Sequence, residues 1–441
     1  MRPLATSGVY LSKNPRPSLA MTVHVTLPQL IKPPTLRRAV RVIADLHLHS
    51  KYALATSKEM DLDHLAAGAK LKGLNLLSCG DFTHPRWQAE LRAKLVPGPG
   101  DGLYSYGGVT WVLGTEVSTV YYQEGRTRKV HHLVFAPDLD VVAQITDLLS
   151  RYGRMASDGR PVLKGLSSAE LVERLTSVSG KVVVIPAHAW TPWFGVFGTK
   201  SGFDSLQECY GDMAQRIFAI ETGLSSDPSI NWRLSSLDSV SLISNSDAHS
   251  AKPWRLGREA NVFEFGRPDY SELFAAIKGR DSAKFLFTIE VDPAYGKYHY
   301  TGHGKCQVSL PPEAAVRKKG VCPVCGKPLT VGVLQRVVEL ADRPEGYVPP
   351  GSVPFKRLLP LAELTAVAVG VGRPDAKRVV EVQDRLVAVL GDEFKVLLDA
   401  PREAIEPVAG AKVADAIIAA REGRIEVTPG YDGVYGVPRI P

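Results

Sequence analysis

The chain has 441 residues and a formal net charge of +7, with 44% hydrophobic and 22% charged residues. These fractions are those of an ordinary globular protein, and the length allows two or three domains. No uninterrupted apolar run is long enough to span a membrane, and five cysteines in such a long chain argue against a disulfide framework. The basic excess, with a pI near 9.0, permits a polyanionic partner such as nucleic acid without requiring one. We therefore expect a cytoplasmic protein that does not bind membranes.

Residues 1–40 are rich in proline, serine and arginine, so we predict an N-terminal extension that is partly disordered, with Met21 as an alternative start. From about residue 41 to residue 294, short apolar runs alternate with helical patterns. Strands are expected at 42–44, 74–78, 110–113, 132–135, 182–185, 217–220 and 240–243, and helices at 61–72, 141–152, 167–178 and 270–278. This alternation predicts an α/β architecture with a parallel sheet, open or barrel-shaped.

Side chains that bind metals stand where these apolar runs end. The first run closes in Asp45-Leu46-His47-Leu48-His49, and the alternation of a strand puts both histidines on one side. Two imidazoles so placed can bind one metal ion, although an isolated pair would more often be surface or packed histidines. The further candidates are Asp81, His84, Glu116, His131, His132, His188, Asp247 and His249. All but His131 and His132, which begin a run, follow a strand, at the end where α/β barrels carry active sites.

The mixture of imidazoles and carboxylates indicates a cluster of divalent ions such as Zn²⁺, Mg²⁺ or Mn²⁺. Glu116 is placed to bridge two ions. The first ion would take His47, His49, Glu116 and Asp247, the second Glu116, His132 and His188, and Asp81, His84 and His249 are left for a third ion or for acid–base and orienting roles. Clustered metals suit phosphoester hydrolysis, because one ion activates water while the others neutralise the phosphate and the leaving oxygen. Each residue alone is as easily a solvated or packed side chain, so the prediction rests on the ordered series.

In order and type, this series resembles the polymerase-and-histidinol-phosphatase (PHP) family of metal-dependent phosphoesterases. The resemblance spans roughly residues 41–290 and implies a distorted (β/α)7 barrel with two or three metals at the strand C-termini, His249 belonging to the third. By motif position it favours His132 over His131. The chain departs from the family pattern in having Ala53-Leu54-Ala55 where many members carry a further histidine, and Asp81-Phe82-Thr83-His84 where Asp-His is usual. The third site is therefore open, with Asp81 or His84 as its candidate ligand.

Residues 295–348 are expected to form a zinc-binding module. His303 and Cys306 form an H-x2-C pair, and after fifteen intervening residues Cys322 and Cys325 form a C-x2-C pair. Four such ligands suit one tetrahedral structural zinc ion, which contributes to folding rather than to chemistry. His299 is the alternative histidine ligand. Nearby basic residues suggest a phosphate-facing surface, although such a run is more often simply solvated.

Residues 349–441 are expected to form a helical domain, with helices at 358–369, 375–390, 392–398 and 412–422. The segment 406–417 resembles the helix–hairpin–helix turn of DNA-binding proteins, with Gly410 just before the helix that holds Lys412. The free amides and the positive dipole end of such a helix can bind a DNA phosphate. Ordinary helix packing explains a single copy equally well.

An aromatic and glycine-rich loop follows His188 and is expected to lie over the metal face. Its candidates for contact with a base or a phosphate are Trp190, Trp193, Phe194, Phe197, Lys200, Ser201 and Gly202. Enzymes that act on a base extrude it from the duplex and hold it between aromatic faces. A packed lid is the simpler alternative.

The order of PHP-type barrel, zinc module and helical tail resembles the endonuclease Q family of DNA-repair enzymes over about residues 41–441. Its particular features are the segments 78–85, 190–202 and 322–330. The resemblance implies a nuclease that recognises uracil, hypoxanthine, xanthine or an abasic site in DNA and nicks the strand on the 5′ side. The expected catalytic residues are Asp247, His249, Asp81 and His84. We expect a monomer associated with the nucleoid, and leave open whether a sliding clamp or a helicase is its partner.

Two functions of other classes compete with this one. A small-molecule phosphatase of the histidinol-phosphate kind would need neither the zinc module nor the tail. A non-catalytic DNA-binding or helicase-associated module would not need His47, Glu116, His188 and Asp247 together.

Overall fold

The protein is described by a computed structural model that covers residues 39–440. Nearly all of the predicted N-terminal extension therefore lies outside the described residues. Residues 39–440 belong to one compact unit. Within the described residues, no helix is both long and apolar enough to cross a membrane.

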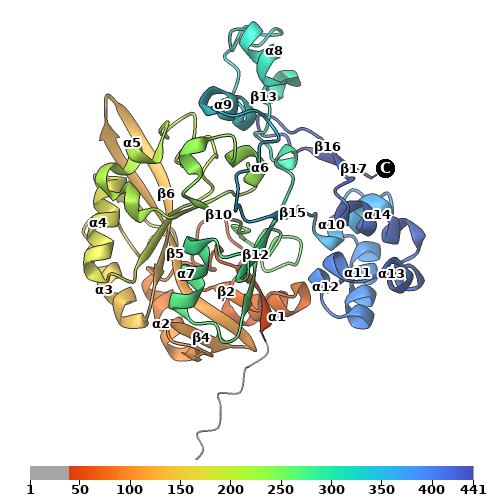
Figure 1. Cartoon of the computed structure of the whole chain (residues 1–441), viewed down its shortest axis with the longest axis horizontal. Helices are drawn as coiled ribbons and strands as arrows, with labels where there is room; N and C mark the ends of the chain where they lie inside the picture. The colour runs from red at the N-terminus through yellow and green to blue at the C-terminus, as the bar shows by residue number, and fades with distance from the viewer. Residues whose placement is uncertain (1–38, 441) are drawn as a thin grey trace, which may run out of the picture. The chain divides into compact units, whose positions relative to one another are not determined.

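A mixed sheet lies at the centre of the first 250 or so described residues (Figure 1). Its parallel core is β1 (Val40–Asp45), β2 (Leu76–Ser78) and the long β5 (Val109–Gln123). On one side follow β6 (Arg126–Ala136) and β8 (Val183–Pro186), and on the other β11 (Ala260–Phe265) and β12 (Phe285–Glu290). The shorter β3 (Val96–Pro97), β4 (Leu103–Tyr106), β7 (Val162–Lys164) and β15 (Phe355–Arg357) extend its edges.

A separate parallel pair, β9 (Ala219–Glu221) and β10 (Ser241–Ile243), completes the strand order of a barrel. In the part of the chain that the structure describes, no hydrogen-bonded ladder joins this pair to the rest of the sheet, so the barrel is not closed by a continuous sheet. The predicted α/β fold with a distorted PHP-type barrel is confirmed, and all seven predicted strands are present.

Three strands run against the parallel direction that the sequence predicts. β6 runs antiparallel to both β5 and β8, β11 runs antiparallel to β1, and the short β4 runs antiparallel to β5. Because β6 runs the other way, its first half lies at the edge where the parallel strands end. This explains why its histidines precede an apolar run while the other candidate ligands follow one.

Helices cover the outside of this sheet. The four predicted ones are α1 (Leu62–Lys72), α3 (Leu139–Ser150), α4 (Ser168–Val178) and α7 (Tyr270–Gly279), and α2 (Pro85–Lys94), α5 (Leu206–Tyr210) and α6 (Pro228–Asn231) are additional. The predicted N-cap of α4 is a full capping box, in which Ser167 Oγ accepts from the Glu170 amide at 3.2 Å and Glu170 Oε2 accepts from the Ser167 amide at 3.0 Å.

Alternation along β1 places Ile43 in the apolar cluster with α1, and Val42 and Ala44 in a second one that lines the sheet's other face.

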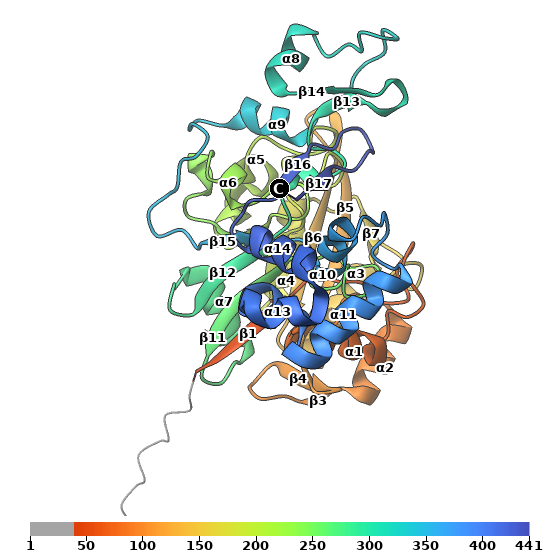
Figure 2. The same cartoon turned by 90° about the vertical axis from the view of Figure 1, so that its right-hand side faces the viewer.

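The region after residue 295 holds the hairpin of β13 (Thr301–His303) and β14 (Val308–Leu310), followed by α8 (Pro312–Arg317) and α9 (Val333–Leu340). Five helices then gather in one group (Figure 2). They are α10 (Leu361–Ala368), α11 (Lys377–Leu390), α12 (Glu393–Leu398), α13 (Arg402–Ala409) and α14 (Ala411–Arg421), and the hairpin of β16 (Glu426–Thr428) and β17 (Val437–Arg439) ends the chain. The predicted helical tail is confirmed, with α13 as a helix that the sequence analysis missed.

A buried ion pair joins these helices to the barrel. Lys72 Nζ, at the end of α1, lies 2.6 Å from Glu393 Oε1 and donates to the Pro253 carbonyl at 3.0 Å. Glu393 also accepts from the Leu361 amide and from Gln383 Nε2, each at 2.9 Å. Because Pro253 lies in the loop after His249, the pair fixes the helical region to a loop of the candidate site.

Candidate active site

The two histidines that follow β1 lie against the loop that follows β10. The Asn245 side chain accepts a hydrogen bond from the Leu46 amide at 2.9 Å, and the His49 amide donates to the Ala248 carbonyl at 3.0 Å. Leu48 and Ala248 also form a parallel β-bridge. These contacts bring the D-x-H-x-H motif beside the S-D-A-H motif, although the two are far apart in the sequence.

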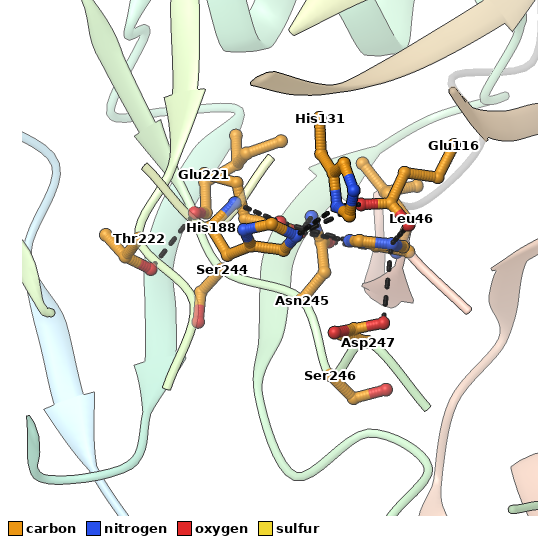
Figure 3. Close-up of polar contacts among 12 residues, drawn as sticks. Leu46, Glu116, His131, His188, Glu221, Thr222, Ser244, Asn245, Ser246 and Asp247 are labelled. Atoms are coloured by element: carbon orange, nitrogen blue, oxygen red, sulfur yellow. Dashed lines mark hydrogen bonds and ion pairs between the residues drawn. The ribbon is translucent and has the colours of Figure 1, made fainter. Parts of the chain in front are cut away.

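Glu116, near the middle of β5, presents each carboxylate oxygen to a different pair of histidines, and Figure 3 shows it beside His131 and His188. Its Oε1 lies 2.7 Å from His131 Nδ1 and 3.0 Å from His188 Nε2. Its Oε2 lies 3.3 Å from His49 Nε2 and 3.7 Å from His47 Nε2. This is the geometry expected of a carboxylate that bridges two metal ions.

Asp247 completes the side of the cluster formed by His47 and His49. Its Oδ1 lies 3.1 Å from His49 Nε2 and 3.5 Å from His47 Nε2. His249, whose Nδ1 lies 2.9 Å from the Asp247 carbonyl oxygen, stands at the edge of the cluster with about a third of its side chain exposed. His49, Asp247 and His249 thus share one neighbourhood, at the place predicted for the third ion.

The structure corrects the choice between the two adjacent histidines of β6. In the β5–β6 ladder, Glu116 stands opposite Leu133, so the side chain two residues before Leu133 shares its face, and that side chain is His131. His132 points to the other face, where it is fully buried against Tyr210 with a ring-centroid distance of 5.8 Å. Burial lowers the pKa of His132 to about 3. The second group of donor atoms is therefore Glu116, His131 and His188.

Two carboxylates hold the outer nitrogens of the first two histidines. Asp81 Oδ1 lies 2.9 Å from His49 Nδ1, and both Glu221 oxygens lie 3.0 Å from His47 Nδ1. A carboxylate accepts, so each Nδ1 carries a proton and each Nε2 faces the cluster. Asp81 also accepts from the amide and hydroxyl of Ser50, at 2.6 and 2.7 Å. Asp81 is thus an orienting residue rather than the ligand that the sequence suggested.

Glu221 was missed by the sequence analysis, although it directly follows the predicted strand at 217–220. The same carboxylate accepts from the His188 amide at 2.7 Å and from Asn245 Nδ2 at 2.8 Å, so it links three of the loops that carry ligands. His84, expected to be catalytic, lies outside the three donor groups and stacks on Tyr52 with ring centroids 4.4 Å apart.

Burial opposes charge on every group in the cluster, and close partners decide which groups are ionised. Burial would raise the pKa of Glu116, but its contacts with His131, Arg160 and His188 lower it well below its usual range. Burial would lower the pKa of His47, but Glu221 and Asp247 raise it well above the ordinary value. The pKa of His131 falls to about 4, because burial outweighs the attraction of Glu116. At neutral pH the cluster therefore offers an ionised carboxylate and a neutral imidazole, and His47 has a proton to release on binding a metal.

The backbone is strained at three positions of this site. Asp81, His188 and Asp247 have φ values of +47°, +28° and +47°, in the left-handed region that non-glycine residues rarely adopt. Next to His188, a Cβ on Gly223 would lie 2.7 Å from His188 Cβ, so only glycine fits there. Strain of this kind persists where the surrounding contacts hold the side chains in a functional arrangement.

The donor set fits divalent metal ions. Among the described residues, His47 Nε2, His49 Nε2 and Asp247 Oδ1 are buried and make no hydrogen bond, which is costly unless another partner is bound. The donor atoms of each group lie within 4.8 Å of one another, the groups being His47, His49 and Glu116; His49, Asp247 and His249; and Glu116, His131 and His188. Imidazole nitrogens and carboxylate oxygens are the ligands of Zn²⁺, Mn²⁺ and related ions.

The predicted zinc ligands also converge. His303, Cys306, Cys322 and Cys325 form one group with donor atoms within 4.8 Å, and His299 is not part of it. The C-x2-C turn is closed by hydrogen bonds from the Gly326 amide to the Cys322 carbonyl at 2.9 Å and from the Cys322 amide to the Lys327 carbonyl at 2.8 Å. Gly326 has φ +71°, a conformation that favours glycine. One histidine and three cysteines suit a tetrahedral structural zinc ion.

Comparison with known proteins places this arrangement in a family. Residues 360–424 match the family described as the MJ0043 C-terminal domain. The chain is 31% identical to the uncharacterized protein YqxK of Bacillus subtilis over 415 residues, which are 90% of this chain and 98% of YqxK. It is 33% identical to the uncharacterized protein MJ0043 of Methanocaldococcus jannaschii over 254 residues, which are 56% of this chain and 31% of that protein.

Two solved structures match nearly the whole chain. The lesion-specific endonuclease PfuEndoQ from Pyrococcus furiosus is 37% identical with a TM-score of 0.82, over 91% of this chain and 96% of that one. An endonuclease Q bound to a 27-mer duplex substrate with an abasic lesion at its active site is also 37% identical, with a TM-score of 0.81 over 91% of this chain and 97% of that one. The chain belongs to the endonuclease Q family. It is therefore a metal-dependent endonuclease.

In this chain, the aromatic loop after His188 divides into a buried part and an exposed part. Trp190 and Phe197 are 1% exposed and pack on each other with ring centroids 4.8 Å apart, so they cannot stack on a base. Ser201 Oγ accepts from the Phe194 amide and donates to the Lys129 carbonyl, both at 3.2 Å, and the Gly202 carbonyl accepts from Arg128. The predicted DNA contacts at these four positions are corrected, because all four hold the loop in place.

Two of the remaining predicted contacts of the loop, Trp193 and Lys200, are exposed, whereas the third, Phe194, is not free to contact a base. Trp193 is 42% exposed and meets Tyr298 edge-on, with ring centroids 5.5 Å apart. Lys200 is exposed. Phe194, with φ +65°, stacks on His131 at 4.3 Å and so covers the metal cluster rather than a base.

The predicted turn of the tail is present between α13 and α14. Gly410 has φ +86° and is exposed, and Lys412 is exposed in the first turn of α14. A positive φ at this point lets the chain turn sharply into the second helix. The family match at 360–424 covers this turn.

Proposed function

We propose that this protein is a lesion-specific DNA endonuclease that nicks the strand 5′ to a deaminated base (uracil, hypoxanthine or xanthine) or an abasic site. The observation that carries the proposal is a cavity of about 630 Å³ lined by Asp247, His249 and His188 of the metal cluster. Its other wall is aromatic and comes from three separate segments, in Trp193, Tyr298 and Tyr435. Such a volume lies within the roughly 300–1,000 Å³ of ordinary ligand pockets, and it accommodates one flipped-out nucleotide.

Lys297 gives this cavity a means of selecting deaminated bases. Its exposed ammonium lines the cavity and lies 5.4 Å from the ring centroid of Tyr298 and 5.9 Å from that of Tyr435. Deamination replaces an exocyclic amine with a carbonyl oxygen. Lys297 can donate a hydrogen bond to that carbonyl, whereas an amine offers it only further donors. An abasic site would enter the same cavity without the cost of unstacking a base.

The cluster residues divide the catalytic work. His47, His49, Glu116 and Asp247 would hold one divalent ion, Glu116, His131 and His188 a second, and His49, Asp247 and His249 are placed for a third. Bound ions of the Zn²⁺, Mg²⁺ or Mn²⁺ class supply activated water and neutralise the phosphate and the leaving 3′-oxygen. Asp81 and Glu221 keep the protons of His49 and His47 on Nδ1, so that both Nε2 atoms face the cluster. Phe194 and the packed loop behind it keep water from the His131 side.

The regions outside the barrel would position the duplex. A single structural zinc ion on His303, Cys306, Cys322 and Cys325 would stabilise the module after the barrel. The amides at the start of α14, with Gly410 and Lys412, would bind a backbone phosphate, and Lys200 a second one. A DNA substrate places the protein at the nucleoid, where it would act as a monomer; a clamp or helicase partner is not needed for this chemistry.

Variants of the cavity wall test the proposal. Purified wild type, Lys297→Met and Trp193→Ala are compared on duplexes with one uracil, hypoxanthine, abasic site or ordinary base, with product ends mapped on a sequencing gel. We expect a cut 5′ to the lesion, a loss of preference for deaminated over ordinary bases in Lys297→Met, and cutting at abasic sites that this variant retains. Exposed Lys305→Met is the matched control. Cutting of undamaged DNA as fast as damaged DNA by the wild type would contradict the proposal.

A further inference from the structure

One cation reaches the metal cluster from outside the set of metal-type ligands. Arg160, in the loop between α3 and β7, has its Nη1 atom 3.1 Å from Glu116 Oε2. This is the oxygen that also faces His47 and His49. The Arg160 side chain is 28% exposed, so it borders solvent on one side and the cluster on the other.

The backbone around Arg160 is fixed to the first metal motif. Asp158 Oδ1 accepts from the Arg160 amide at 3.2 Å and from the Leu54 amide at 3.0 Å, and the Gly159 amide donates to the Tyr52 carbonyl at 3.1 Å. Position 159, directly before Arg160, accepts only glycine, because a Cβ on Gly159 would lie 2.3 Å from Asp81 Oδ2. The segment after His49, which contains Tyr52 and Leu54, thus supplies no further metal ligand. It fixes the position of the loop that carries Arg160.

The guanidinium keeps most of its donors unused. Among the described residues, Glu116 is the one side-chain partner of Arg160, and that contact uses a single Nη1 hydrogen. A guanidinium stays protonated in proteins, so the charge of Arg160 is permanent. With a metal ion held by Glu116, the guanidinium of Arg160 would have its donors free for an incoming anion. The planar fork of arginine matches two oxygens of a phosphate group.

We propose that Arg160 is a catalytic residue that binds a non-bridging oxygen of the scissile phosphate and stabilises the negative charge that develops there during cleavage. The inference rests on the proposed function, since it takes a phosphodiester as the substrate. In this role Arg160 supplies a permanent positive charge from the protein, in addition to the positive charge that bound metal ions would supply.

Three variants test this role. Arg160→Gln removes the charge, Arg160→Lys keeps it without the fork, and Arg154→Gln makes the same change at an exposed position of the same loop. For each variant one measures the single-turnover nicking rate on a uracil duplex, the Kd for that duplex, bound metal per chain by mass spectrometry, and the thermal midpoint. We expect the Gln variant to lose a factor of about 100–1,000 in rate, as for other single donors to a developing oxyanion. We expect the Lys variant to recover part of the rate, and metal content, Kd and midpoint to stay close to wild type.

The hydrolysis of bis(p-nitrophenyl) phosphate separates this proposal from the proposed function. If the wild type fails to nick damaged DNA but hydrolyses this diester, lesion recognition is refuted while a rate loss in Arg160→Gln on the diester still supports the role of Arg160. A wild-type rate in Arg160→Gln on both substrates would overturn the proposal. So would a parallel loss of bound metal, because Arg160 would then act by organising Glu116.

Discussion

Glu221 is the residue on which the geometry of the candidate site depends most, and its replacement by glutamine isolates that dependence. Every contact of its carboxylate is with a donor: His47 Nδ1 at 3.0 Å, the His188 amide at 2.7 Å and Asn245 Nδ2 at 2.8 Å. An amide has the same shape but one acceptor oxygen and one NH₂ group. In Glu221→Gln, at least one of these buried donors therefore faces another donor.

The magnitude follows from the two roles of this carboxylate. An unpaired buried donor costs about 1–3 kcal/mol, which lowers the stability of the loops that carry His47, His188 and Asn245. Loss of the residue that orients a metal-binding histidine typically reduces metal affinity or activity 10–100-fold. That range corresponds to about 1.4–2.8 kcal/mol of binding free energy. We expect both effects together, because the histidine tautomer and the loop position depend on the same oxygens.

Isothermal titration of Mn²⁺ into metal-stripped protein measures this loss directly, with nicking of a uracil duplex as the second readout. Glu264→Gln is the matched control, because Glu264 is an exposed carboxylate of β11 with no ion pair among the described residues. Glu264→Gln is expected to bind metal like the wild type. Unchanged Mn²⁺ affinity and nicking in Glu221→Gln would refute the reasoning that this carboxylate sets the orientation of His47.

Three further predictions follow from the fold. His131→Ala should lose bound metal and nicking activity, whereas His132→Ala should keep both and lose only stability. The measurement is the metal content per chain of each variant, and the reverse pattern would contradict the register of β6 against β5. Lys72→Met should lower the free energy of unfolding, measured in urea, by roughly 3–5 kcal/mol, because Glu393 stays buried without its partner. A Lys72→Met/Glu393→Leu double variant should recover much of this loss. If the losses of the two single variants instead add up in the double variant, the two residues do not act as a pair. Burial raises the pKa of Glu290 to about 8, so the folded state binds a proton that the unfolded chain releases near 4.5, and stability falls as pH rises between these values. As pH rises between these values, the free energy of unfolding of Glu290→Gln should therefore increase relative to that of the wild type, by up to about 1.4 kcal/mol per pH unit. If the difference in free energy of unfolding between variant and wild type is the same at pH 5 and pH 8, the prediction is wrong.

Local sequence patterns were enough to find many of the elements and most of the ligands. Each predicted strand was a short apolar run and each predicted helix a 3.6-residue pattern, and all are present. The ligands His47, His49, His188 and Asp247 could be placed because a parallel strand delivers whatever follows it to one edge of the sheet. The zinc ligands needed only spacing, since a C-x2-C turn is a local structure.

The errors came from information that is not local. The choice of His131 over His132 depends on the register of β6 against β5, which is set by the pairing of two strands and cannot be read from either one. The role of Glu221 depends on a contact with His47 on another strand. Trp190 and Phe197 look like a stacking platform in sequence, yet the loop folds back and packs them inside. Local patterns thus predicted which groups meet, but not which face each one presents.

The most direct test of the account is strand nicking by wild type and Asp247→Asn on duplexes with a single uracil, hypoxanthine or undamaged base, in Mg²⁺ or Mn²⁺. Asp247 Oδ1 lies between His47 and His49 on one side of the cluster, so an amide there removes a metal-binding charge without changing the shape of the residue. We predict a lesion-dependent cut on the 5′ side by the wild type and its loss in the variant. Undiminished cutting by Asp247→Asn, or release of phosphate from small monoesters with no cut in any DNA, would contradict the account.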